Sequence, residues 1–228
     1  MLVLFISALI SVAAVATCFT MQTSSGTTIF SGLVGFFIPL FLIGFLVRKK
    51  TNKIQNALQE AMLAGQKRVN RKIQQFQSKP GGNIKLIQRQ IEGDQKVLLT
   101  EALTFVDRLE PFKKWNLLMG RQIATMRLQF FYQLKDFEPV DALLASGGLF
   151  KGPLMMEPMA IAMKMARQYK KKDIKGAEKT FTRHIRWFRG DRGTLLYGLM
   201  SWIFMKTDES EKARQILNKA KDSTGNET

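Results

Sequence analysis

The chain lacks charge over its first 47 residues, because every one of its 35 lysines and arginines and 18 aspartates and glutamates lies at Arg48 or beyond. It also has only one cysteine, Cys18, and one histidine, His184. A single cysteine excludes an intrachain disulfide and a cysteine metal site, and a single histidine excludes a pair of histidine metal ligands. Nucleophile-elbow and phosphate-loop motifs are absent as well. We therefore predict no enzyme activity, no metal ion and no cofactor.

Two apolar runs fill the uncharged segment, Leu2–Phe19 and Ile29–Val47. Both are close to the length of about 20 residues that a helix needs to cross a bilayer. The stretch Met21–Thr28 between them is polar and short, so it can form a turn but not a domain. The second run ends in Arg48-Lys49-Lys50, and basic residues beside a span stay on the cytoplasmic side. We predict that residues 1–47 form a transmembrane hairpin and that the rest of the chain is cytoplasmic.

A cleaved signal peptide is the alternative interpretation of the first run. Ala14-Val15-Ala16 resembles a cleavage site, but Met1–Ile6 lacks the basic residues that a signal peptide carries. Small residues in the second run (Gly32, Gly35 and Gly44) would allow another helix to approach closely, or they have no particular partner.

Residues 48–82 have the pattern of a basic amphipathic helix followed by a linker. Ile54, Leu58, Gly65 and Val69 recur at three- to four-residue spacing, with Ile73 and Phe76 after them. Such a helix either continues out of the membrane, lies on its surface or is a solvated connector. Positive side chains near a bilayer attract anionic headgroups. The candidate lipid or partner contacts of this segment are Arg48, Lys49, Lys50, Lys53, Lys67, Arg68, Arg71 and Lys72.

The remainder, residues 83–221, is predicted to be helical, because no stretch alternates with the period of two that is typical of a strand. Helices are expected from about Ile84 to Leu109 and from about Trp115 to Leu134, with a short one ending at Ala145. Pro and paired Gly mark the breaks between them. The polar tail, residues 222–228, is expected to be frayed.

An internal repeat appears in the last third of the chain. Ala177, Phe181 and His184 recur 36 residues later as Ala213, Leu217 and Ala220. Each set follows a second apolar helix, predicted at about Glu157–Tyr169 and about Thr194–Met205.

This spacing resembles that of the tetratricopeptide repeat, a helix–turn–helix unit of 34 residues. In the second unit Tyr197, Ser201 and Phe204 occupy the family's packing positions in the first helix, together with Met200. The first unit departs from the pattern, since Tyr169 stands one residue too close to Ala177. A more degenerate unit is predicted to precede it. The residues assigned to that unit are Met126, Phe130 and Ala142.

The resemblance implies an all-α fold: two transmembrane helices followed by an antiparallel helical array, or α-solenoid. A bundle of helices without repeats is the alternative. The whole layout is similar to that of the HemY-type family of bacterial inner-membrane proteins. That resemblance rests on architecture and implies an inner-membrane location, but it transfers no functional residue.

Positive charge is concentrated late in the chain, where Lys164–Arg192 contains eleven lysines and arginines against three acids. Lys179, Arg183 and Arg186 fall on one face of a predicted helix, opposite the repeat-packing residues. This face either is simply solvated or binds a polyanion. We rank anionic lipid and an acidic partner protein above nucleic acid, because membrane tethering by itself accounts for part of the charge.

Three functions are therefore open. The first is a membrane-anchored scaffold that binds a partner protein or peptide. The second is an accessory subunit of a transport or secretion complex, with its main contacts in the membrane. The third is a basic surface for anionic lipid or nucleic acid. Because so few repeats seldom form a stable array alone, we expect the repeats to be covered by the preceding helices between Ile84 and Leu134 or by a second copy of the chain.

Overall fold

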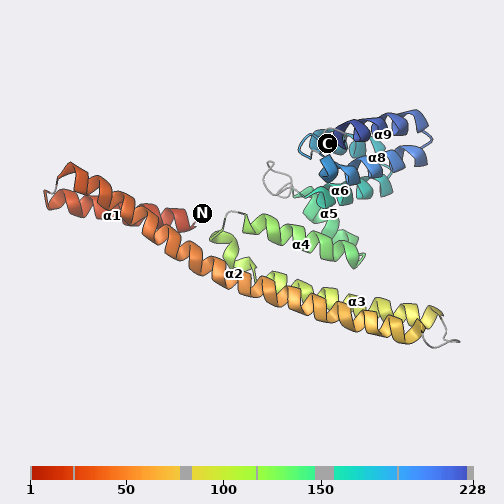
Figure 1. Cartoon of the computed structure of the whole chain (residues 1–228), viewed down its shortest axis with the longest axis horizontal. Coiled ribbons are helices and arrows are strands. Elements are labelled where there is room, and N and C mark those ends of the chain that lie inside the picture. The colour runs from red at the N-terminus through yellow and green to blue at the C-terminus, as the bar shows by residue number, and fades with distance from the viewer. Residues whose placement is uncertain are drawn as a thin grey trace. The chain divides into compact units, whose positions relative to one another are not determined.

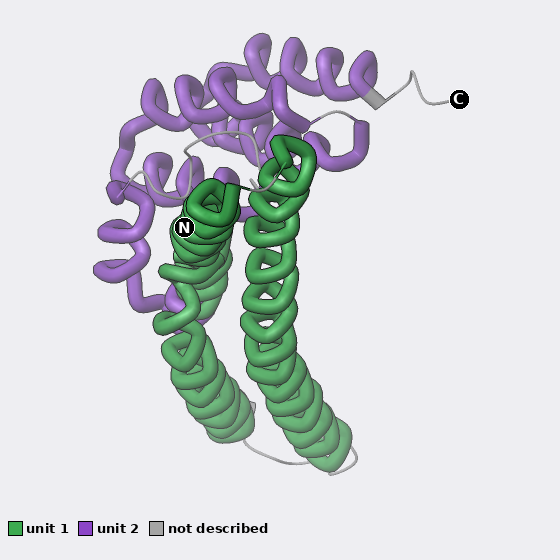
Figure 2. Tube along the Cα trace, turned by 90° about the vertical axis from the view of Figure 1, so that its left-hand side faces the viewer, with its two compact units in different colours: residues 1–130 green, residues 131–228 purple. Residues whose placement is uncertain are grey.

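In the part of the chain that the computed structural model describes, every regular element is a helix (Figure 1). The described residues are 2–22, 24–77, 84–116, 118–146, 157–188 and 190–224. The predicted all-α class is confirmed for these ranges. The chain divides into two compact units, residues 1–130 and residues 131–228 (Figure 2).

The first unit begins with two antiparallel helices, α1 (Leu2–Thr20) and α2 (Ser25–Gln77) (Figure 1). Both contain a stretch that is long and apolar enough to cross a membrane. They approach closely where α2 has glycines: a Cβ atom on Gly32 would lie 2.8 Å from Val15 Cγ2, and one on Gly35 would lie 3.2 Å from Ala14 Cβ. Ser11 Oγ donates a hydrogen bond of 2.8 Å to the Gly32 carbonyl oxygen. These glycines therefore have a partner within the chain.

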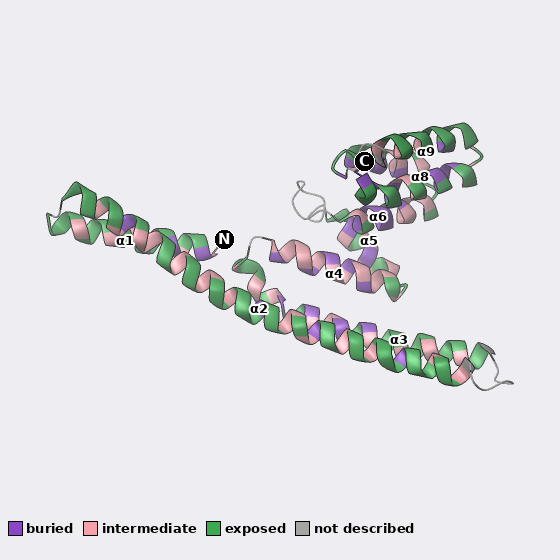
Figure 3. Ribbon diagram, in the orientation of Figure 1, coloured by how far each residue is buried: buried purple, intermediate pink, exposed green. Residues whose placement is uncertain are grey.

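Helix α2 does not end with its apolar run but continues for 53 residues as one helix. Its second half pairs with α3 (Ile84–Asp107), and Leu58, Val69 and Leu99 are buried along this pair (Figure 3). The sequence analysis placed a domain boundary at 82/83 and grouped α3 with the C-terminal helices. In the structure α3 belongs instead to the first unit, and the division between units falls at 130/131.

The turn after α3 leads into a short 3-10 helix, η1 (Glu110–Lys114), and then into α4 (Met119–Gln133). Arg127 of α4 holds this turn with two ion pairs, to Glu110 at 2.6 Å and to Asp107 at 2.7 Å. The helix predicted from Trp115 begins later, at Met119, and Asn116 Oδ1 accepts a hydrogen bond from the Leu118 amide in the turn that precedes it.

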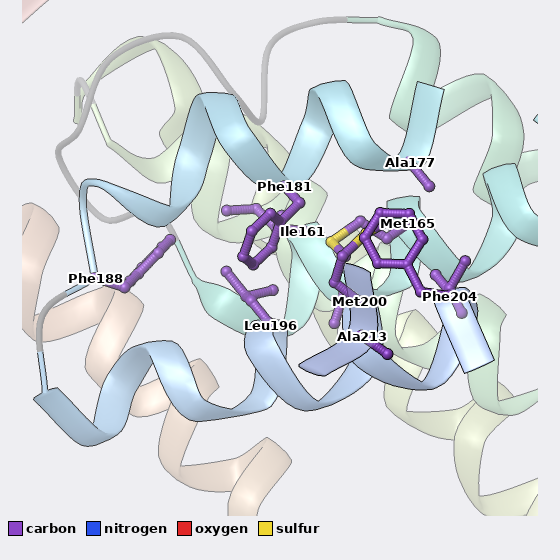
Figure 4. Packing of buried hydrophobic residues seen from close by; sticks show 11 residues of the cluster. Ile161, Met165, Ala177, Phe181, Phe188, Leu196, Met200, Phe204 and Ala213 are labelled. Carbon is purple, nitrogen blue, oxygen red and sulfur yellow. The ribbon is translucent and has the colours of Figure 1, made fainter. Parts of the chain in front are cut away.

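The second unit contains α5 (Phe137–Ala145), α6 (Pro158–Lys170), α7 (Ile174–Ile185), the 3-10 helix η3 (Gly190–Gly193), α8 (Thr194–Lys206) and α9 (Ser210–Thr224). Their core is a cluster of buried apolar side chains from α6, α7, α8 and α9 (Figure 4). Ile161, Leu196 and Met200 are completely buried in it. Helix α6 contacts both α7 and α8, and α8 contacts α9.

The same turn occurs three times, after α4, α6 and α8. In each case a residue in the left-handed region follows the helix, namely Lys135, Lys172 and Asp208 with φ of 59°, 61° and 59°. The next amide then bonds to the carbonyl oxygen five residues back. These bonds are Asp136 to Phe131 at 3.0 Å, Asp173 to Gln168 at 2.9 Å and Glu209 to Phe204 at 2.9 Å. Such a bond satisfies carbonyl groups that a helix end leaves free. The same helix ending thus recurs at spacings of 37 and 36 residues.

The recurring turn corrects the sequence alignment of the units. Phe204 is equivalent to Gln168 and not to Tyr169, which accounts for the one-residue misfit. Val140, which is completely buried, takes the place equivalent to Ala177, whereas the predicted Ala142 is exposed. Ala142 was assigned because it lies at a family-like separation from Met126 and Phe130, but the turn geometry determines the register.

Candidate functional site

Helix α8 is apolar on every side, which is unusual for a surface helix. Leu196, Met200, Ile203 and Phe204 face the core and are buried. Leu195, Trp202 and Met205 are 44%, 46% and 64% exposed on the opposite side. A helix that is apolar all round normally has protein or lipid on all sides. The outer side of α8 is therefore the strongest candidate for a binding surface in the second unit.

We define the α8 face as Leu195, Gly198, Leu199, Trp202 and Met205, which fall within about a third of the helix circumference. The Tyr169 ring of α6 packs edge-on against Trp202, with 5.1 Å between ring centroids, and so fixes the indole. Gly198 has nothing within 4 Å of where a Cβ atom would stand. It leaves an open notch between the larger side chains of Leu195 and Trp202.

Basic residues surround the α8 face in the sequence. Residues 157–206 contain twelve lysines and arginines but only four acids. Lys170 and Lys206 are exposed at the ends of α6 and α8, respectively. An apolar strip with a positive surround is complementary to an amphipathic helix with an acidic border.

The predicted basic face on α7 is present as a surface. Lys179, Arg183 and Arg186 are all exposed, while Ala177 and Phe181 on the other side of the same helix are buried. Arg186 lies over the Trp187 ring, with its guanidinium carbon 5.0 Å from the ring centroid.

His184 is buried beside that face, and its Nδ1 lies 2.7 Å from the Thr180 carbonyl oxygen. Because a carbonyl only accepts, Nδ1 donates this bond. Burial lowers the pKa of His184 despite the Thr180 bond, and the positive charges of Lys164, Arg183 and Arg186 lower it further. Burial and the charge of Arg183 also lower the pKa of Lys164. These two groups are held between α6 and α7 in a positive environment.

Other residues predicted to pack the repeats lie mostly in the core. Ser201, Phe204 and Ala213 are buried, and Ser201 Oγ donates a hydrogen bond of 3.4 Å to the Ala213 carbonyl oxygen. Tyr197 and Ala220 are partly buried. Leu217 differs, since it is 50% exposed. Helix α9 is the last described helix, and nothing in the described residues covers the side on which Leu217 lies.

Arg167 connects α6 to α5 across the undescribed segment. Its guanidinium pairs with the Asp141 carboxylate through both oxygens, at 2.9 and 2.8 Å, and it stacks over Phe137 with 4.3 Å to the ring centroid. The hydrogen bond from Arg167, together with that from Lys171, lowers the pKa of Asp141 to about 2. Asp141 therefore stays ionised throughout the physiological range. This fixed pair orients α6, from which Tyr169 reaches the α8 face.

The basic residues predicted to contact lipid separate into two groups along α2. Arg48, Lys49, Lys50 and Lys53 are exposed directly after the apolar run. The other four lie close to α3, at about 28 Å or more from Arg48 along a helix that rises 1.5 Å per residue. Those four are Lys67, Arg68, Arg71 and Lys72, all exposed, and Lys72 forms an ion pair with Asp94 of α3. The first group is therefore the one next to the apolar helices.

Sequence reasoning missed Trp202, Gly198 and Trp115. The uninterrupted apolar composition of Thr194–Met205 signals an extra contact face on α8, but it was interpreted only as repeat packing. No local pattern points to Trp115, because its neighbours on α1 and α2 are far from it in the sequence. The pairing of α3 with α2 brings them together.

No group of three or more His, Cys, Asp or Glu side chains in the described ranges is placed to hold a metal ion. No protein-family model, curated protein or solved structure matches the chain.

Proposed function

We propose that the protein is a membrane-anchored docking protein, whose C-terminal helices bind an acidic amphipathic helix of a partner at the cytoplasmic face of a membrane. The observation that supports this most directly is the α8 face: an exposed apolar strip on a helix that is apolar all round, with the Tyr169 ring packed edge-on against Trp202. Partner helices that bind grooves present such anchors at spacings of three, four and seven residues.

Anchoring is supported by α1 and α2. Most of the large apolar side chains that the structure leaves exposed lie between Leu4 and Leu46, where no charge occurs. Lipid would cover this surface, and the basic group after Val47 would place the C-terminal unit in the cytoplasm. On this proposal the mechanism is localisation, because a tether raises the effective concentration of the partner at the membrane.

The recurring turn supports a tetratricopeptide-like array in which α6 pairs with α7 and α8 pairs with α9, and its copy after α4 supports the predicted degenerate unit before them. Its period of 36 to 37 residues is longer than the 34 of that family. The solenoid arrangement and a relationship to HemY-type proteins are part of the proposal.

The alternative, a subunit that acts mainly through its spans, receives less support. Gly32 and Gly35 face α1 within the same chain, so of the three glycines predicted to allow a close approach Gly44 alone remains open to a partner span. Replacing residues 1–47 by an unrelated anchor separates the two: a docking protein keeps its partner after the exchange, and a membrane subunit loses it.

The direct test places a photo-reactive amino acid at Met205, on the α8 face, and for comparison at Lys219, exposed on α9. In native membranes we expect a discrete protein adduct from position 205 and none from position 219. The adduct should map to an acidic amphipathic segment of the partner. Equal adducts from both positions, or a basic or unstructured target segment, would contradict the proposal.

Gly198→Arg gives a second, matched test. The side chain would fill the open notch without meeting another atom within 4 Å at its Cβ, and replacing glycine in a helix favours the fold by up to about 1 kcal/mol. We expect the adduct from position 205 to disappear while the thermal stability of the second unit stays the same or rises. An undiminished adduct would exclude the notch from the docking surface.

A further inference from the structure

The chain returns to the end of the apolar helices at one point far along the sequence. Helix α2 runs outward past Arg48, α3 pairs with it, and the turn after α3 ends at Trp115 and Asn116 (Figure 1). These two residues line a groove together with Val3 and Leu4 of α1 and with residues of α2 between Leu40 and Arg48. All of these belong to the first unit.

The groove changes character along its length. Leu4, Phe41 and Phe45 provide an apolar wall and are largely exposed, whereas Arg48, Trp115 and Asn116 provide polar groups at the other end. Its volume is about 600 Å³, and none of its lining residues is acidic. At Gly44 nothing lies within 4 Å of the place where a Cβ atom would stand, so this glycine leaves part of the hollow open.

A second hollow of about 700 Å³ shares Phe45 and Arg48 with the first. It is lined by Lys49 and Lys53, with Glu60 as the acid at its far end. Arg48, Lys49 and Lys53 therefore place positive charge directly after the end of the apolar run.

The position of Trp115 has a physical reason. Arg127 holds η1 through Glu110 and Asp107, and the Trp115 amide donates a hydrogen bond of 3.0 Å to the Phe112 carbonyl oxygen. Asn116 Oδ1 accepts a hydrogen bond from the Leu118 amide. Tryptophan is enriched at the boundary between hydrocarbon and headgroups, where its ring is apolar and its N–H group finds a polar partner. Here it stands at the level of the first charge in the chain.

We propose that this groove binds one anionic phospholipid, with an acyl chain along Leu4, Phe41 and Phe45, and with its phosphate near Arg48 and the Trp115 indole. The inference rests on the membrane anchoring proposed above and adds a defined lipid site to it. Lipid would then stabilise the junction at which α1, α2 and the turn after α3 meet. The α2–α3 pair would be held at a fixed height above the bilayer.

The test uses the full chain with Trp187→Phe and Trp202→Phe, which leaves Trp115 as the sole tryptophan. The protein is reconstituted into phosphatidylcholine vesicles that contain, at the same mole fraction, either brominated phosphatidylglycerol or brominated phosphatidylcholine. We expect Trp115 fluorescence to be quenched by both, with about a fivefold preference for the anionic lipid, since one basic group near the surface contributes about that factor.

Three variants make the result specific. Arg48→Gln should remove at least half of the preference, while Lys67→Gln, the same loss of charge farther along α2, should leave it unchanged. Gly44→Leu should reduce quenching by both lipids, because the side chain occupies the hollow.

Equal quenching by the two lipids, or a preference that survives Arg48→Gln, would overturn the lipid site. Absence of quenching in protein that floats with the vesicles and resists carbonate extraction would overturn it as well, yet leave the anchoring intact. Protein that neither floats nor resists extraction would overturn both the anchoring and the lipid site.

Discussion

The two units of this protein bury their apolar residues in different ways. In residues 131–228 the buried side chains of α6, α7, α8 and α9 form one cluster, with Leu196, Met200 and Ile203 fully inaccessible. In residues 1–130 helices pair along their length, and large side chains such as Phe5, Phe19 and Phe41 remain exposed (Figure 3). Both units are helical and rich in apolar residues, so composition alone does not distinguish them.

The difference shows which apolar surface of each unit is left for lipid or another protein to cover. The second unit has a core of its own, and its exposed large apolar side chains in the described ranges are Leu195, Trp202 and Met205 on the α8 face and, apart from these, Met159, Trp187 and Leu217. The first unit has its largest apolar surface on α1 and the first half of α2, where contiguous exposure of this extent indicates an interaction with lipid or protein. A mutation in the cluster should therefore act on a whole unit, while one in a helix pair should act locally.

The largest effect is expected from Phe204→Ala. This ring is 2% exposed at the centre of the cluster, and removing a buried Phe side chain costs about 3 to 5 kcal/mol. We expect the protection of amides against hydrogen exchange to fall throughout α6, α7, α8 and α9, but not in α2 and α3. Peptide-resolved exchange with mass spectrometry measures both regions in the same sample.

Leu217→Ala is the control for that change. It also shortens a large apolar side chain in the second unit, but Leu217 is half exposed, so we expect a change within about 0.5 kcal/mol. Similar losses of protection in the two variants, or loss in α2 and α3 after Phe204→Ala, would contradict the independence of the units.

A smaller and more local effect is expected at Gly65, where α2 and α3 touch. A Cβ atom there would lie 2.2 Å from Leu98 Cδ1 and 2.9 Å from Leu98 Cγ, so Gly65→Ala forces Leu98 aside. Overpacking of this kind costs about 1 to 3 kcal/mol. We expect faster amide exchange in the second half of α2 and in α3, with the core of the second unit unchanged.

The matched substitution is Gly93→Ala, which adds the same methyl group to α3 where no atom lies within 4 Å of it. Without a clash, alanine should stabilise the helix by up to about 1 kcal/mol. The two changes are thus expected to have opposite signs. The double variant Gly65→Ala with Leu98→Ala should recover part of the stability that Gly65→Ala loses. If Gly65→Ala and Gly93→Ala both stabilise the protein, the close contact between Gly65 and Leu98 is wrong.

Local patterns were sufficient for most of the helices and for the uncharged hairpin. The apolar runs, the glycine- and proline-rich breaks and the spacing of Ala177 and Ala213 are properties of neighbouring residues, and these predicted elements agree with the described ones within a few residues. The pairing of α3 with α2 is not local: it depends on the fit of Leu98 against Gly65 across an undescribed connection. For the same reason no sequence pattern placed Trp115 beside Arg48.

The repeat register shows the same limit on a smaller scale. Small residues such as Ala142 and Ala177 look equivalent in sequence, but the left-handed residues Lys135 and Lys172 align Val140 with Ala177. Lysine has no preference for that backbone region, so its role in the turn is invisible in composition. The α8 face was visible as an apolar run but was interpreted as core, because only the fold shows which side of a helix is covered.

The smallest expected effect is the pH dependence that His184 adds to the second unit. Burial lowers the pKa of His184 in the folded protein below the ordinary histidine value of about 6.5, so the unfolded chain binds a proton before the folded one as pH falls. The free energy of unfolding should therefore decrease as pH falls through about 6.5 toward the folded pKa. The contribution of the neutral His184 to stability is complete above that range. Asp141, with a pKa of about 2, does not titrate in this window.

Urea midpoints of the second unit at about pH 7.5 and about pH 5.5 measure the decrease, and His184→Gln should remove the part of it that comes from His184. If the variant shows the same decrease in urea midpoint, the pH dependence comes from other groups. The charges of Lys164 and Arg183 then have no detectable effect on the protonation of His184.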